Sequence, residues 1–254
     1  MASRTASPTR SKVAGGRLQS AGTAETPARP ACGLLPAACC LFFLLAAVLA
    51  TGCEDPSLKF NKAGLEAYRG GDYTRAQAAF EEAIQQNPDV GEYYFNRAMA
   101  EQAIGNLRPA IFSYDMATRL SPGIVAAYQN AATCLVQLGE PQKALAELVK
   151  GTQANPFNGQ AFINLAKFHL GQNDIYNTKL SLAKAAAADP DNAAVHREYG
   201  RFLIQTGDRK KGLEELRKSL EIEPLQPALS AEVSKLAPPG EQLPPPKPMT
   251  QSKP

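Results

Sequence analysis

Residues 87–122 read NPDVGEYYFNRAMAEQAIGNLRPAIFSYDMATRLSP, with prolines at positions 88 and 122, 34 residues apart. Three further prolines keep this spacing, so the whole series is Pro88, Pro122, Pro156, Pro190 and Pro224. Proline lacks a backbone N–H and clashes with the preceding helical turn, so each proline is expected just after the end of a helix. The spacing divides the chain into five units, 57–90, 91–124, 125–158, 159–192 and 193–226.

Other positions follow the same period. The eighth position of each unit is small, as close helix packing requires: Gly64, Ala98, Ala132, Ala166 and Gly200. The fourth is aromatic in all units but the last: Phe60, Tyr94, Tyr128, Phe162 and His196. The fifteenth is Gly71, Gly105, Gly139, Asn173 and Gly207, residue types that tolerate the left-handed conformation at a helix end. Each unit is therefore predicted to be a helix, a tight turn and a second helix.

This pattern resembles the tetratricopeptide-repeat family over residues 57–226. The resemblance implies an all-α fold, a right-handed α-solenoid in which neighbouring helix pairs bury one another's apolar faces. A capping helix is predicted over residues 227–237, because apolar residues recur on one helical face at Leu225, Leu229, Val233 and Leu236. Residues 238–254 are rich in proline and predict a disordered tail.

The N-terminus predicts a targeting signal. Residues 37–50 are uninterrupted apolar, a length typical of a signal peptide and short for a membrane span. The following residues, Ala50-Thr51-Gly52-Cys53, resemble a bacterial lipoprotein box. The resemblance implies that residues 1–52 are removed, that Cys53 carries the lipid, and that residues 53–56 form a short linker. Two alternatives stay open: an uncleaved membrane anchor and an organelle transit peptide.

Composition excludes several kinds of site. Beyond residue 52 the charge is close to neutral, which argues against a nucleic-acid partner. Cys134 is the only cysteine beyond Cys53 and is expected to be buried, so neither a disulfide nor a thiolate metal site is predicted. His169 and His196 fall at packed positions. We therefore expect no catalytic residues, no cofactor, no metal and no small-molecule substrate.

In this family the first helix of each unit lines the concave, ligand-binding face. An asparagine recurs at the sixth position, and its amide can pair with the backbone of an extended peptide. Basic residues at one end would suit an acidic segment, and apolar residues would form pockets. The candidate groove residues are Asn96, Asn130, Asn164, Lys167, Arg197, Arg201, Phe95, Met99 and Ile163. The asparagines are equally consistent with a structural role.

The predicted function is a non-catalytic interaction scaffold that binds proteins or extended peptides, with acidic segments among the candidates. The predicted location is the bacterial cell envelope, facing the periplasm from the outer or inner membrane through the lipid on Cys53. The architecture is similar to that of lipid-anchored repeat proteins in type IV pilus assembly and outer-membrane biogenesis. A periplasmic peptide receptor of chaperone type and an adaptor with an uncleaved anchor are the alternatives.

Overall fold

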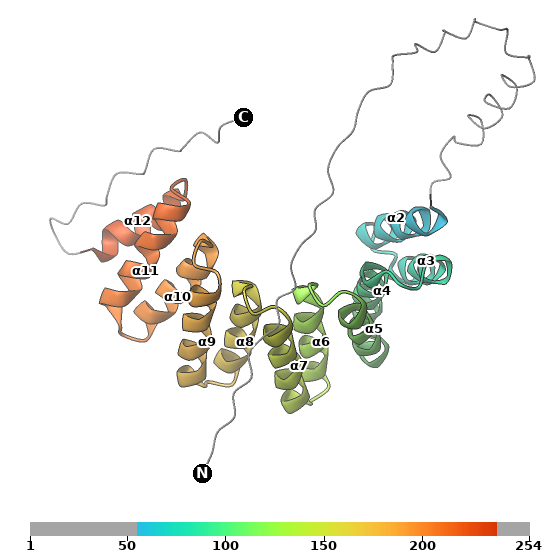
Figure 1. The fold of residues 1–254 in the computed structure, drawn as a ribbon, viewed down its shortest axis with the longest axis horizontal. Helices are drawn as coiled ribbons and strands as arrows, with labels where there is room; N and C mark the ends of the chain where they lie inside the picture. The colour runs from blue at the N-terminus through green and yellow to red at the C-terminus, as the bar shows by residue number, and fades with distance from the viewer. Residues whose placement is uncertain (1–54, 238–254) are drawn as a thin grey trace, which may run out of the picture. The chain divides into compact units, whose positions relative to one another are not determined.

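The computed structural model describes residues 55–237. The predicted signal peptide 1–52, Cys53 and the tail 238–254 lie outside the described residues. Within residues 55–237 the chain forms eleven helices and no strand: α2 (Pro56–Arg69), α3 (Tyr73–Gln86), α4 (Gly91–Ile104), α5 (Leu107–Leu120), α6 (Val125–Gln137), α7 (Pro141–Ala154), α8 (Gly159–Gly171), α9 (Ile175–Ala188), α10 (Ala193–Gln205), α11 (Arg209–Ile222) and α12 (Pro227–Leu236). Consecutive helices pair and follow one another in a curved row (Figure 1). The predicted α-solenoid of five helix pairs with a last helix is confirmed.

The turn inside each pair forms as its sequence predicts. Gly71, Gly105, Gly139 and Gly207 have φ angles of 80°, 94°, 75° and 92°, and Asn173 has a φ of 56°. These left-handed residues end the first helix of each unit. They also let the backbone N–H of the following residue donate to a carbonyl in the last turn of that helix. For example, the Asn106 N–H donates to the Glu101 carbonyl over 2.9 Å. The positive φ of Asn173 explains why the fourth unit keeps its turn without glycine.

Small residues at the eighth position let the two helices of a unit approach closely. A Cβ atom on Gly64 would lie 2.5 Å from Cε1 of Phe80, which is fully buried. In the fifth unit both facing positions are glycine, and a Cβ on Gly200 would lie 2.8 Å from the Gly212 carbonyl oxygen. The helices α10 and α11 therefore pack backbone against backbone.

The last helix, α12, closes the C-terminal end of the row. Leu229 and Val233 are buried against Leu213 and Leu216 of α11. Leu225 was predicted on the same apolar face, and this prediction is wrong. The side chain of Leu225 is 80% exposed because it lies in the segment before the helix, which begins only at Pro227.

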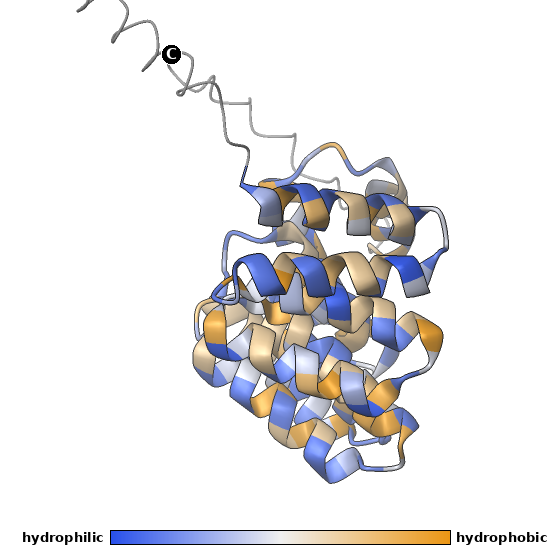
Figure 2. Ribbon diagram, turned by 90° about the vertical axis from the view of Figure 1, so that its right-hand side faces the viewer, coloured by the Kyte–Doolittle hydropathy of each residue, from blue (hydrophilic) through white to orange (hydrophobic). Residues whose placement is uncertain are grey.

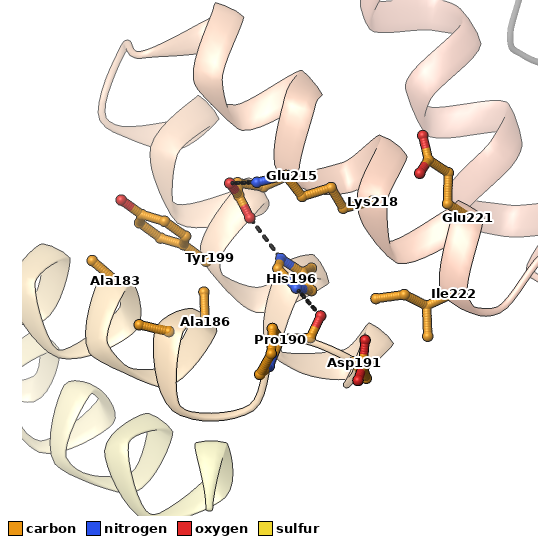
Figure 3. Close-up of a pocket in the computed structure, with 11 residues that line it drawn as sticks. Ala183, Ala186, Pro190, Asp191, His196, Tyr199, Glu215, Lys218, Glu221 and Ile222 are labelled. Carbon is orange, nitrogen blue, oxygen red and sulfur yellow. Dashed lines mark hydrogen bonds and ion pairs between the residues drawn. The ribbon is translucent and has the colours of Figure 1, made fainter. Parts of the chain in front are cut away.

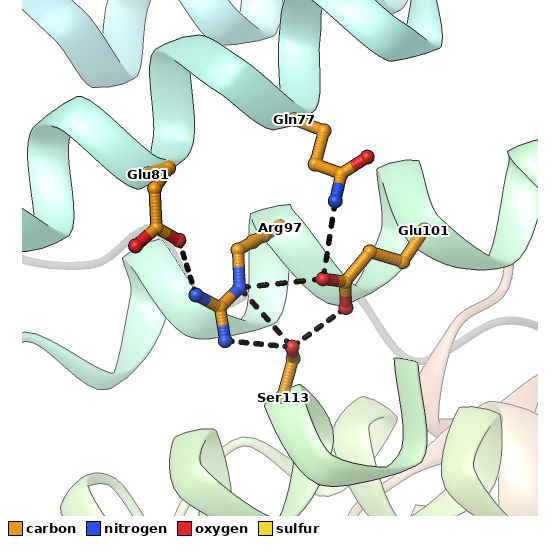
Figure 4. Close-up of polar contacts among 5 residues, drawn as sticks. All are labelled: Gln77, Glu81, Arg97, Glu101 and Ser113. Carbon is orange, nitrogen blue, oxygen red and sulfur yellow. Dashed lines mark hydrogen bonds and ion pairs between the residues drawn. The ribbon is translucent and has the colours of Figure 1, made fainter. Parts of the chain in front are cut away.

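A buried polar network joins the first two units (Figure 4). The Arg97 guanidinium on α4 pairs with Glu81 on α3, lies 3.6 Å from the Glu101 carboxylate, and donates to Ser113 Oγ on α5 over 3.0 Å. Ser113 in turn donates to Glu101 over 2.6 Å, and Gln77 donates to the other Glu101 oxygen over 3.5 Å. Every member has a partner, as a stable buried network requires.

Apolar and polar residues follow one another along the helices, and the helices nearest the viewer in Figure 2 carry both orange and blue residues. The apolar residues face neighbouring helices and form the shared core. Each helix between residues 55 and 237 falls short of the length and apolar character that crossing a membrane requires.

Candidate functional site

The first helices of the units form the inner side of the curved row. Contacts between helices two apart in the chain join α2 with α4, α6 with α8, and α8 with α10, all of them first helices. Among the described helices no pair of second helices makes comparable contact. The first helices thus lie closer together, which places them on the concave side.

A pocket with a volume of about 220 Å³ lies on the inner side, between α6 and α8. We call it the inner pocket. Its lining residues come from α6, α7 and α8: Gln129, Ala132, Thr133, Val136, Leu148, Asn164, Lys167 and Phe168. Leu148 is 4% exposed and belongs to the core, whereas Val136 is 46% exposed. The pocket therefore has an apolar floor that is open to the concave side.

A small residue at the ninth position of the third unit helps to create this pocket. Thr133 occupies the position held by Leu65, Met99, Lys167 and Arg201 in the other units. Its hydroxyl donates to the Gln129 carbonyl over 3.0 Å, so the side chain stays close to its own helix. The small ninth residue of the third unit is visible in the sequence, but its placement beside Leu148 and Phe168 is seen only in the structure.

Two polar groups at the pocket come from α8. The Asn164 Oδ1 accepts a hydrogen bond from Gln160 Nε2 over 2.8 Å, and the side-chain nitrogen of Asn164 has no partner among residues 55–237. Lys167 is exposed and makes no ion pair with any described residue. Asn164 is itself 4% exposed, so its unpaired amide nitrogen is buried at the pocket, whereas the Lys167 cation is open to solvent.

The other predicted groove asparagines have different surroundings. Asn96 is 4% exposed, and its Nδ2 donates to Asn61 Oδ1 of the preceding unit over 2.9 Å. Asn130 is half-buried and lies beside the hydroxyl of the buried Tyr114. The structure therefore does not bring the three asparagines together as one exposed row: Asn96 joins two units, and Asn164 lies at the inner pocket.

The predicted apolar groove residues lie partly in the core. Phe95 and Met99 are half-buried and pack against the core of the first three units, and the Phe95 ring lies 5.8 Å from that of Tyr114. Ile163 is 3% exposed and belongs to a core cluster further along the row.

The predicted basic end of the groove is occupied by the last helix and the segment before it. The Arg201 guanidinium pairs with Glu232 of α12 over 2.7 Å, and Arg197 donates to Gln226 over 2.9 Å. Hydrogen bonding to Glu232 raises the pKa of Arg201. Lys167 is therefore the predicted groove cation that the described residues leave unpaired.

A second, larger cleft lies between α9, α10 and α11, with a volume of about 580 Å³ (Figure 3). His196 is 4% exposed at its base, with Nδ1 2.6 Å from Glu215 Oε2 and Nε2 2.8 Å from the Pro190 carbonyl oxygen. Lys218 donates to the other oxygen of Glu215 over 2.7 Å. His196, Glu215 and Lys218 satisfy one another's hydrogen bonds, so we interpret the cleft as a structural junction between units rather than a ligand site. The expectation that His196 is buried is confirmed.

This junction yields a pH prediction. Burial would raise the pKa of Glu215, but hydrogen bonds from Lys218 and His196 outweigh it and lower the pKa below its ordinary value. A lowered carboxyl pKa stabilises the fold above the ordinary pKa of 4.5, and this stability is lost as the pH falls through the folded-state pKa. Glu215→Gln is therefore expected to lower the free energy of unfolding at pH 7 by about 1–2 kcal/mol.

The measurement is urea unfolding of both proteins between pH 7 and pH 3, with Glu214→Gln as the control because Glu214 is the exposed neighbour. The difference for Glu215→Gln should shrink below about pH 4. An equal difference at every pH would contradict the linkage.

The remaining candidate groups lie away from any open site. Cys134 is fully buried, as expected, and burial raises the pKa of its thiol. Between residues 55 and 237 no group of three or more histidine, cysteine, aspartate or glutamate side chains is placed to hold a metal ion.

Comparison with known proteins agrees with the helix pairs. The sequence model of the tetratricopeptide repeat matches residues 61–124. A search of curated protein sequences gives no significant match. The fold is similar to that of TTC0263, a thermophilic repeat protein of Thermus thermophilus, at 19% identity and a TM-score of 0.50, covering 71% of this chain and 98% of that chain.

Two further solved structures share the fold. One is PilW, described as a widely conserved type IV pilus biogenesis factor, with 21% identity, a TM-score of 0.50, and coverage of 71% of this chain and 85% of that chain. The other is pilF of Pseudomonas aeruginosa, with 15% identity, a TM-score of 0.53, and coverage of 72% and 85%. At these identities the likeness concerns the fold. The family match shows tetratricopeptide repeats in residues 61–124, and the same 34-residue period and helix pairing continue through the other units of the described chain.

Proposed function

We propose that this protein is a non-catalytic scaffold, tethered to a membrane, that holds partner proteins or extended peptides on its inner side. The observation that carries the proposal is the inner pocket. It combines an open apolar surface at Val136 with an unpaired cation at Lys167 and an amide donor at Asn164. Apolar surface with a few placed polar groups is typical of a binding site.

The proposed partners belong to the assembly of the cell envelope. This part of the proposal is supported by the lipoprotein-like N-terminus and by the shared fold with PilW, whose description names type IV pilus biogenesis. A solenoid suits such a role because successive units present a continuous concave surface.

The experiment that tests binding is a crosslinked pull-down from native membranes with paired surface variants. Val136→Lys places a charge at the inner pocket, and Leu180→Lys places one on α9, a second helix. The two side chains are 46% and 43% exposed, so both variants should fold equally well, which circular dichroism checks. Partners lost with Val136→Lys and kept with Leu180→Lys support the proposal; partners kept by both would overturn it.

The second candidate function is a receptor that binds peptides transiently. The inner pocket also favours this function, because its volume suits a single side chain. Stoichiometry separates the two functions. A scaffold co-purifies with one or a few partners at fixed ratios, whereas a receptor captures many polypeptides at low and variable ratios.

The tether is proposed to be the lipid on Cys53, which would place the described residues in the periplasm. Two acyl chains anchor a protein stably where one is marginal. We expect Cys53→Ser to release the protein from the detergent phase, or to leave it as an unprocessed precursor, while wild type partitions with membranes. Cys134→Ser is the matched control, because Cys134 is buried within the repeats.

Mass spectrometry of the N-terminal peptide completes this test. The proposal expects a diacylated Cys53 as the first residue of the mature protein. An intact N-terminus on the wild-type protein, with no lipid on Cys53, would instead identify an uncleaved anchor.

A further inference from the structure

We infer that the inner pocket binds one large apolar side chain of an extended acidic peptide, with Lys167 pairing a carboxylate next to that side chain. This inference rests on the proposed binding function and names the class of ligand. It differs from the sequence prediction, which distributed peptide binding over asparagines and arginines along the whole groove.

The size of the pocket selects a side chain. Its volume of about 220 Å³ is below the roughly 300–1,000 Å³ of sites that hold small molecules. The floor is Ala132, Leu148 and Phe168, which offer no strong hydrogen-bonding group of their own. An apolar side chain gains most from such a floor, because burial removes its surface from water.

The charge at the pocket selects an acidic neighbour. Lys167 is the lining residue that carries a charge, and no described acid pairs with it. Arg197 and Arg201 bind α12 and the segment before it and do not compete for the same ligand. A carboxylate one residue away from the apolar side chain in the pocket can therefore form an ion pair with Lys167.

The amides at the pocket suit an extended backbone. Asn164 lines the pocket and is 4% exposed, and its side-chain nitrogen has no partner among the described residues, so it can donate to a peptide carbonyl that enters the pocket. Gln129 on α6 lines the facing side and is half-buried. Amide donors on both helices would hydrogen-bond the peptide backbone and so orient the peptide whatever its other side chains are. The specificity would then come from the apolar side chain in the pocket, which we call the anchor, and from the acidic residue next to it.

The test measures binding of fluorescent Gly/Ser peptides to the mature chain. The central residues are Asp-Leu-Asp, Asp-Ala-Asp or Asn-Leu-Asn. We expect Asp-Leu-Asp to bind roughly tenfold more tightly than Asp-Ala-Asp, because leucine buries more apolar surface. It should bind about two- to five-fold more tightly than Asn-Leu-Asn at low salt, and this second advantage should fade as salt is added.

Two variants of the protein separate the anchor from the charge. Thr133→Met fills the pocket with the residue that the preceding unit carries as Met99, so the fold should accept it, and the leucine advantage should disappear. Lys167→Gln should remove the advantage of aspartate and keep that of leucine. Lys62→Gln, an exposed lysine on α2, is the matched control and should change neither.

The peptide measurements test this inference, whereas the pull-down from native membranes tests the proposed function, so the two can fail separately. Equal binding of the three peptides, or an unchanged leucine advantage in folded Thr133→Met, would overturn the inference, whatever partners the pull-down finds. No binding of any peptide would also overturn it. The proposed function would then depend on whether Val136→Lys still releases partners from native membranes.

Discussion

Phe80→Ala is expected to lower the free energy of unfolding by about 3–5 kcal/mol, the range for removing a buried aromatic ring. The ring is fully buried and lies against Gly64, where no side chain can move in to fill the space. It also packs with Ala76 and with Ala100 of the next unit, so its loss weakens the junction as well as the pair.

Urea unfolding followed by circular dichroism measures this effect. Phe157→Ala is the matched control, because Phe157 is 84% exposed and its removal should change stability by less than about 0.5 kcal/mol. Repeat proteins can unfold unit by unit, so a separate early transition in Phe80→Ala would be consistent with the structure. Equal effects of the two substitutions would contradict the described packing.

Arg97→Met is expected to cost about 3 kcal/mol at pH 8, because it removes the cation from a buried network. The side chains of Arg97 and Glu101 are 13% and 6% exposed. Without Arg97, the Glu101 carboxylate keeps hydrogen bonds from Ser113 and Gln77 and has no opposite charge in contact. A buried charge left without its partner is the main source of the expected loss.

The pH dependence of this loss identifies its cause. Burial already raises the pKa of Glu101, against the opposing effects of Ser113 and Arg97, and removing Arg97 should raise it further. The loss should therefore be largest well above the ordinary pKa of 4.5 and should shrink as the pH falls and Glu101 takes up a proton.

The double variant Arg97→Met/Glu101→Gln is the control for this prediction. It should recover part of the stability at pH 8 and should lack the pH dependence of the single variant. A loss that is the same at pH 8 and pH 5 would show that packing of the Arg97 side chain, rather than the charge of Glu101, dominates.

The sequence predicted the helix pairs because their determinants are local. A proline just after a helix prevents the helix from continuing, and a glycine or asparagine at the fifteenth position allows the left-handed turn within the same unit. Asn173 shows that the rule concerns conformation rather than residue type. The small eighth residues were predictable for the same reason, since Gly64 faces a partner only sixteen residues away.

The candidate site was harder to predict because it depends on contacts between units. The partner of Asn96 is Asn61 in the preceding unit, and the partner of Arg201 is Glu232 on α12. Such pairings follow from how successive helices are placed, and no spacing in the sequence specifies them. The inner pocket likewise arises where the small Thr133 lies near Leu148 and Phe168, which belong to α7 and α8.

The most direct test of the central claim, that the inner side holds the partners, is photo-crosslinking from single positions in native membranes. A benzophenone amino acid would replace Gln160, which contacts Asn164 beside the inner pocket without lining it, or, in a parallel protein, Leu180 on α9. Both residues are exposed, so both probes can be accommodated. We expect discrete adducts from position 160, lost on adding excess Asp-Leu-Asp peptide, and none from position 180. Adducts from position 180 alone would contradict it and would assign binding to the second helices.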